Sequence, residues 1–163
     1  MAIVSGNLKL YLTGGASNTL PSASLGGVTS NTAFTDNALQ NLFANVSPAE
    51  ALAGSVKYRA LSFKNLAAET AYEAVIYLSQ ETSSADTTVA IAFDSTGTQS
   101  VVNENTAPTG LTFSTPLSLV AGIALGDVAA SGVKRVWFRR TTTAGAAAAN
   151  DTGKFSITVG SAP

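Results

Sequence analysis

The chain has 163 residues, and its nine basic and ten acidic side chains give a formal net charge of −1 at pH 7. It contains no cysteine and no histidine, which excludes a disulfide framework, a thiol nucleophile, an imidazole base and the usual zinc site. Because affinity for phosphate groups depends on many lysines and arginines, we expect no nucleic-acid partner. Alanine, glycine, serine and threonine make up 80 residues, and the larger apolar residues suffice for one core, so we expect a single domain overall.

The sequence also predicts no membrane partner. The N-terminal residues carry no positive charge before a long apolar run, which argues against a secretory signal. Between Glu104 and Asp127 lie 22 uncharged residues, but prolines and glycines interrupt them. Short strands joined by turns are therefore expected there, rather than a membrane-spanning helix. We expect a protein made in a reducing cytoplasm.

Residues 1–54 predict a strand, an irregular arm and a short helix. In residues 8–12 leucines alternate with other residues, which is typical of a strand. Residues 13–35 are rich in Gly, Ser, Thr and Asn without a sustained period, and predict an extended arm. Residues 47–50 (Ser-Pro-Ala-Glu) match a capping box and predict a helix of one or two turns, preceded by another helical turn at 37–43.

Residues 55–163 predict a β-sandwich core, because short apolar alternations follow one another at near-regular spacing with almost no helix between them. On the second of these strands Tyr72, Ala74, Ile76 and Leu78 are expected to face inward. The alanine-rich residues 144–151 predict a hairpin loop, and the fold class is all-β, an antiparallel β-sandwich. The expected strands span residues 56–64, 72–78, 88–93, 133–142 and 155–159, with short strand candidates at 111–113 and 117–119.

No motif in the sequence indicates catalysis or a cofactor. A phosphate-binding loop, a dinucleotide fingerprint and a nucleophile elbow are all absent. The ten carboxylates are scattered, and no two of them share a predicted strand face at the spacing that would make them converge. Residues 94–97 (Asp-Ser-Thr-Gly) are weakly similar to a calcium loop but lack its alternating acids and closing glutamate. We therefore predict that the chain is not an enzyme and has no cofactor and no metal site.

The most distinctive local feature is residues 134–140, which hold four of the nine basic residues and the only tryptophan. In a strand Arg135, Trp137 and Arg139 lie on one side. One interpretation is a cationic, aromatic stripe that contacts a partner, since Trp and Arg are enriched in interfaces. The other is a sandwich strand whose apolar face is buried and whose arginine stems cover their neighbours. Of the two, we favour the buried strand.

Several short phrases occur in a fixed order along nearly the whole chain. They are SLGG (24–27), NLFANVS (41–47), EALAG (50–54), VKYR (56–59), KN (64–65), LGD (125–127) and VWFRRT (136–141), followed by the alanine-rich loop and Asp151. Taken together, they resemble a group of small structural proteins of tailed bacteriophages. The resemblance implies a virion component with an immunoglobulin-like or jelly-roll-like sandwich. Within that group we expect a capsid decoration (cement) protein, which binds the outer face of the assembled shell and stabilises it.

The resemblance implies the major capsid protein as partner, together with copies of the chain itself, with a homotrimer as the leading hypothesis. The implied location is the capsid surface of a virion assembled in the cytoplasm of a host bacterium. The arm is then expected to lie within residues 1–54 and to order on contact with the shell. Its expected anchors are Leu20, Leu25, Phe34, Leu42 and Phe43, for which packing on their own sandwich is an equal alternative.

Two other functions stay open from the sequence. One is a structural subunit of the phage tail or baseplate. The other is a carbohydrate-binding module or host-surface adhesin. Lectins of the sandwich class usually expose several aromatic rings on one face, whereas this chain has one Trp and four Tyr residues, mostly inside expected strands.

Overall fold

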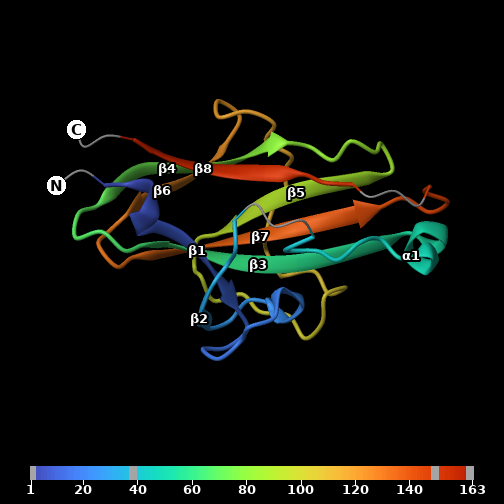
Figure 1. Ribbon diagram of the computed structural model, residues 1–163, viewed down its shortest axis with the longest axis horizontal. Helices are drawn as coiled ribbons and strands as arrows, with labels where there is room; N and C mark the ends of the chain where they lie inside the picture. Colours follow the sequence, from blue (N-terminus) through green and yellow to red (C-terminus); the bar gives the residue numbers. More distant parts are fainter. Residues whose placement is uncertain (1–2, 37–39, 148–150, 161–163) are drawn as a thin grey trace.

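The computed structural model describes residues 3–36, 40–147 and 151–160, and it shows two antiparallel β-sheets packed face to face (Figure 1). This confirms the predicted all-β sandwich. The larger sheet has the strand order β2-β1-β3-β7-β5, and the smaller has the order β6-β4-β8. The strands are β1 (Leu8–Thr13), β2 (Thr29–Ala33), β3 (Ser55–Asn65), β4 (Ala71–Gln80), β5 (Thr87–Asp94), β6 (Ile123–Val128), β7 (Val133–Thr142) and β8 (Lys154–Gly160); the helices are α1 (Pro48–Ala53) and the 3-10 turns η1 (Ser5–Asn7) and η2 (Pro21–Ala23).

The centre of the larger sheet is the long pair β3–β7, which runs in unbroken register from Ser55 opposite Thr142 to Lys64 opposite Val133. Alternate residues of both strands point between the two sheets, as the period of two predicts. On β7 these are Val136 and Phe138, and they join the main core. The predicted strands at 56–64, 88–93, 133–142 and 155–159 are all present.

The smaller sheet contains an irregularity that the sequence did not reveal. Ala74, Ile76 and Leu78 face the core as predicted, but Tyr72 does not. The register of β4 against both neighbours shifts between Ala71 and Val75, and Glu73 has a φ of 49°. An extra residue in the strand reverses the side on which the residues before it point, so Ala71 takes the inward place expected for Tyr72.

The expected irregular arm contains more structure than predicted. Residues 13–35 include η2 and the strand β2, which pairs with β1 at the edge of the larger sheet. The helix α1 follows as predicted, with Ser47 as its N-cap and a complete capping box to Glu50. Of the helical turn expected at 37–43, residues 37–39 lie outside the described part, and residues 40–43 are not helical.

The segment between β5 and β6 also corrects the prediction. Residues 111–113 and 117–119 do not form strands, and the segment makes isolated bridges at Ser100, to Gly26, and at Ser114, to Ile91. The strand β6 was not predicted. The hairpin expected at 144–151 is wrong as well, because β7 and β8 belong to different sheets and the connection crosses between them; residues 148–150 lie outside the described part.

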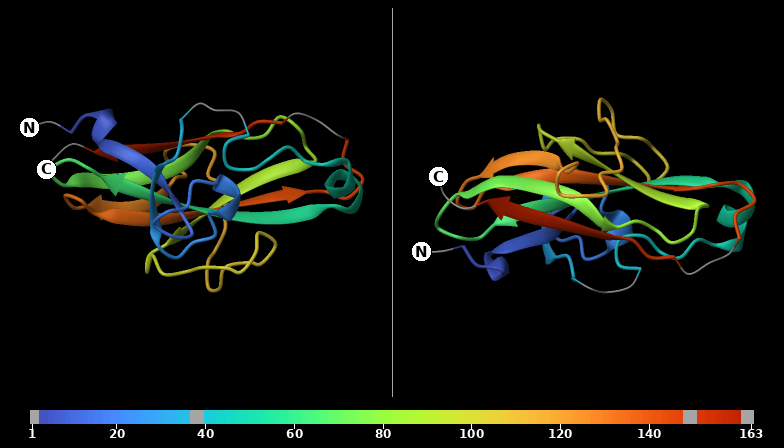
Figure 2. Two further views of the ribbon diagram at one scale, coloured as in Figure 1. Left: turned by 60° about the horizontal axis from the view of Figure 1, so that its bottom comes forward. Right: turned by 90° about the horizontal axis from the view of Figure 1, so that it is seen from above.

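The two outer faces of the sandwich differ. A second small core lies on the outer face of the larger sheet, where Tyr58, Ala60, Ala92 and Trp137 pack beneath the loop that contains Val101, Leu111 and Phe113. The view from above shows β4, β6 and β8 with no such cover (Figure 2, right). In the described part of the chain, no helix is long and apolar enough to cross a membrane.

Candidate interaction surfaces

The only tryptophan of the chain, Trp137 of strand β7, packs inside the molecule. Trp137 is fully buried beneath the loop segments that cover the larger sheet. The backbone at Gly26 approaches so closely that a Cβ atom there would lie 2.6 Å from Trp137 Cζ2. The alternation of β7 is as predicted, and Trp137 lies inside the molecule, as the buried-strand interpretation requires.

The arginines beside Trp137 hold these covering segments in place. Arg135 donates from Nε to the Ser62 hydroxyl at 3.1 Å and from Nη2 to the Gly27 carbonyl at 2.7 Å. Burial lowers the pKa of the Arg135 guanidinium, against the opposing charge of Asp94. The Arg139 guanidinium lies 5.2 Å from the ring centre of Phe113. The positive charges of the expected stripe thus contact the chain's own loops.

Three of the five expected arm anchors pack on their own sandwich. Phe34, Leu42 and Phe43 are half-buried against the main core, and the Phe34 and Phe155 rings lie 6.4 Å apart. Leu25 is half-buried, and its carbonyl accepts a hydrogen bond from the Val101 amide. Leu20, by contrast, is 59% exposed. For most of these residues the structure therefore shows intramolecular packing.

A network of five charged residues lies at the end of β3 near α1. Lys57 bonds both Glu50 and Glu104, the second at 2.9 Å between Nζ and Oε1. Arg59 also bonds Glu104, and Arg140 Nη2 lies 3.8 Å from Glu50 Oε1. Sequence reasoning missed this network, because its members come from four separate segments.

This network strongly perturbs its carboxylates. Burial alone would raise the pKa of Glu50, but hydrogen bonds from Lys57 and from the Ser47 amide and hydroxyl lower it to about 2. The pKa of Glu104 is likewise lowered, since bonds from Lys57 and Arg59 outweigh its burial. Both acids are held ionised and paired, which suits a structural role and leaves neither as a proton donor.

The loop that is weakly similar to a calcium site is closed by its own amides. Asp94 Oδ1 accepts hydrogen bonds from the Thr96 amide at 3.1 Å and hydroxyl at 2.7 Å and from the Gly97 amide at 2.9 Å, while Oδ2 accepts from Gln99 at 3.0 Å. Against its burial, these bonds lower the pKa of Asp94. Within residues 3–36, 40–147 and 151–160, no group of three or more acidic residues is placed to hold a metal ion.

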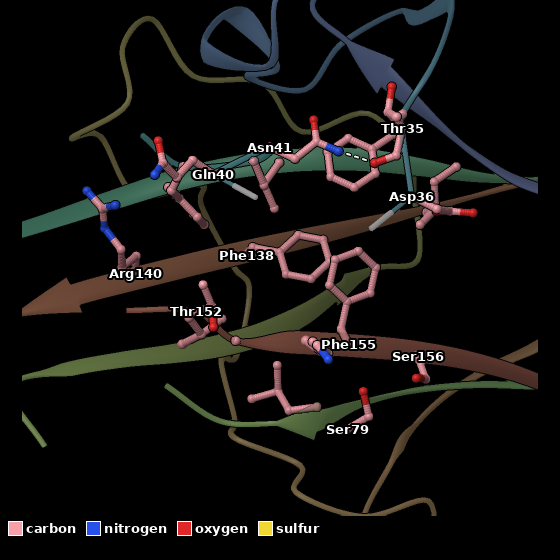
Figure 3. A pocket seen from close by; sticks show the side chains of 18 of the residues that line it. Thr35, Asp36, Gln40, Asn41, Ser79, Phe138, Arg140, Thr152, Phe155 and Ser156 are labelled. Atoms are coloured by element: carbon pink, nitrogen blue, oxygen red, sulfur yellow. Dashed lines mark hydrogen bonds between the residues drawn. The ribbon is translucent and has the colours of Figure 1, made fainter. Parts of the chain in front are cut away.

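A cavity of about 1010 Å³ lies at one side of the sandwich between β1, β8, residues 33–36 and residues 40–46. Phe138 and Phe155 meet in its wall, with ring centres 4.6 Å apart (Figure 3). Two of its polar side chains bind neighbouring backbone: Asn41 donates to the Thr35 carbonyl, and Arg140 donates to the Ala44 carbonyl. The cavity wall combines apolar and polar side chains, and the arm forms part of it.

Three of the exposed large apolar side chains lie close together in sequence, on a segment that sequence reasoning assigned to a strand. Leu117, Leu119 and Val120 are 59%, 48% and 99% exposed, on the loop that precedes β6. Beside this loop is a depression of about 580 Å³ on the outer face of the smaller sheet, with Glu73 and Asp127 at its rim. The available signal was the long uncharged run between Glu104 and Asp127.

The described residues thus combine a network of paired charges with a loop that carries three exposed apolar side chains. No protein-family model, no curated protein and no solved structure matches the chain. The role of this surface must therefore be argued from its geometry alone.

Proposed function

We propose that this chain is a structural protein of a tailed-bacteriophage virion that binds the outer surface of the capsid and stabilises it, and that it is not an enzyme. One observation carries the proposal: the buried charged side chains bind one another or the chain's own loops, while large apolar side chains cluster on an exposed loop. Apolar patches on soluble proteins mark sites of association. The resemblance of the sequence phrases to small phage structural proteins supports the capsid as the partner.

The rigidity of the covered sheet supports such a role. The arm contributes β1 and β2 to the larger sheet, and Arg135 ties residues 27–29 to β7. A body that is already ordered loses little conformational entropy when it docks on a preformed lattice. Many copies on one shell then add weak contacts through avidity.

The glycan-binding alternative gains no support from the aromatic residues. Every Trp, Tyr and Phe of the chain lies among the described residues, and each is buried or half-buried. The single Trp is fully buried. A flat aromatic platform for a sugar ring is therefore not offered by this surface, whereas the tail or baseplate alternative differs from our proposal only in location.

Two measurements test the proposal. Purified protein added to empty shells that lack it is expected to bind saturably and to raise the temperature at which the shells disrupt. A β-sandwich protein of similar size and charge serves as the control. Gold-labelled antibody against the chain is expected to decorate phage heads. Labelling confined to tails would establish the tail alternative in place of decoration.

The proposed partners are the major capsid protein and further copies of this chain. A homotrimer is the leading hypothesis for the free protein, and size-exclusion chromatography with light scattering measures it directly. A monomeric mass at working concentration would restrict self-association to the shell surface.

A further inference from the structure

We infer that the loop Leu117–Val120, together with the uncovered outer face of β4, β6 and β8 beside it, is the surface that contacts the shell protein. The inference rests on the proposed function and names the face of the molecule that performs it. The partner it fits is a protein surface with an apolar recess for Leu117 and Val120 and a lysine or arginine opposite Glu73 and Asp127.

The loop is anchored to both sheets just before its exposed tip. Ser114 exchanges two backbone hydrogen bonds with Ile91 of β5, at 2.8 and 3.0 Å. The Pro116 carbonyl accepts a bond of 2.8 Å from the Leu78 amide of β4, so the segment joins the two sheets. The Leu119 carbonyl then accepts a bond of 3.0 Å from the Gly122 amide, which closes a turn before β6 begins at Ile123. An anchored loop closed by a turn has less conformational entropy to lose on binding than a free loop has.

The tip differs from other exposed apolar positions because its large side chains are adjacent. Leu117, Leu119 and Val120 fall within four positions, and the tip protrudes from the sandwich beyond the smaller sheet (Figure 1). Val102, which is 88% exposed, belongs to the loop that follows β5 and covers the larger sheet, and this loop lies on the opposite side of the molecule (Figure 1). Clustered apolar side chains at the centre of a contact dominate binding, whereas isolated ones are ordinary surface.

The neighbouring depression adds charge to this apolar surface. Val75, Ala124 and Thr158 line it, together with Leu119 and the two acids Glu73 and Asp127. A Cβ atom on Gly160 would lie 2.9 Å from Glu73 Oε2, so this carboxylate lies beside the backbone of β8.

The bulge fixes the position of these two acids. Asp127 Oδ1 accepts a bond of 3.0 Å from the Glu73 amide, at the residue whose positive φ interrupts β4. Both residues are exposed, and no described cation forms an ion pair with either. Two carboxylates held close together favour a cationic side chain of the partner and repel an anionic one.

The experiment compares two matched surface variants by co-sedimentation with empty shells of the phage that carries the gene. The test variant is Leu117→Ser with Val120→Ser, and the control is Val102→Ser on the opposite loop. We expect the test variant to bind about tenfold more weakly, because it removes apolar area from the contact, and the control to bind as the wild type does. Glu73→Gln is expected to weaken binding at low salt and to reduce its salt dependence.

Thermal unfolding and circular dichroism of each variant check that the fold is kept. If wild-type protein does not bind shells, the proposed function fails and this inference fails with it. If wild type binds and the test variant binds equally well, the docking surface is wrong while the function stands. If the test variant keeps its shell binding but loses self-association measured by light scattering, the surface belongs to a second copy, and the inference is overturned.

Discussion

Gly26 shows how much of this fold depends on one close approach of the backbone. It has a φ of 87°, and a Cβ atom there would lie 2.1 Å from the Gln99 carbonyl oxygen and 2.6 Å from Trp137 Cζ2. Its neighbour Gly27 has a φ of 70°, but a Cβ atom would meet only the Ser100 side chain, at 3.7 Å. Both positions therefore require a positive φ, but only at Gly26 would a Cβ atom clash with its neighbours.

We predict that Gly26→Ala lowers the free energy of unfolding by about 2–4 kcal/mol, because strain and overpacking add. Gly27→Ala, which keeps the strain without the clash, is expected to cost about 1 kcal/mol. Chemical denaturation of both variants measures the difference. If both variants lose the same free energy of unfolding, the close contact with Trp137 is not the reason why position 26 requires glycine.

The ion pairs of Glu50 predict a pH dependence of stability. Its folded-state pKa is about 2 against an ordinary value of 4.5, so the unfolded chain binds more protons between these values. The free energy of unfolding must then fall as the pH is lowered through this window. Glu104 and Asp94, whose pKa values are also lowered, act in the same direction.

Glu50→Gln is expected to lower stability at pH 7 by about 1–3 kcal/mol and to flatten part of the slope between pH 5 and about pH 2. Urea unfolding at a series of pH values measures this slope. Asp36→Asn, at an exposed acid, controls for the loss of one negative charge. A slope unchanged by Glu50→Gln would contradict the assignment of the network as a stabilising one.

At the scale of secondary-structure elements, the sequence predicted features that depend on neighbouring residues but not features that depend on distant parts of the chain. The capping box at Ser47 and the alternation of residues 133–142 each depend on neighbours in sequence, and both predictions are confirmed. The bulge at Glu73 and the short strand β6 depend on register against other strands, which one sequence does not display. Residues 117–119, in the apolar loop before β6, were predicted as a short strand but do not form one. Whether such a segment pairs with another strand depends on the fold and not on the segment alone.

Strand β7 makes a prediction that separates packing from recognition. Because Trp137 is fully buried under the covering loops, its fluorescence in the folded protein is expected to resist quenching by acrylamide. Binding to shells should leave the emission unchanged, since the ring does not lie at the docking surface. The denatured chain provides the fully quenched control. Strong quenching of the native protein that shell binding relieves would place this strand in the interface.

At the scale of the whole molecule, the alternation of apolar residues predicted the sandwich but not its asymmetry. Regular alternation in several segments sufficed for two antiparallel sheets. That loops cover one outer face while the other is bare follows from contacts such as Arg135 with Gly27 and Tyr58 with Phe113, which join distant parts of the sequence. The five-residue charge network could not be predicted for the same reason. Its members come from separate parts of the sequence, and only the fold brings them into contact.

We propose that this molecule acts by docking one uncovered sheet face and the apolar loop beside it on the shell. A reconstruction of the phage head by cryo-electron microscopy tests this most directly. We predict density for the sandwich on the outer surface of the shell, with β4, β6 and β8 and the loop Leu117–Val120 facing the coat protein. Density for the sandwich only in the tail, or on the shell with Val102 and its loop facing the coat, would contradict the account.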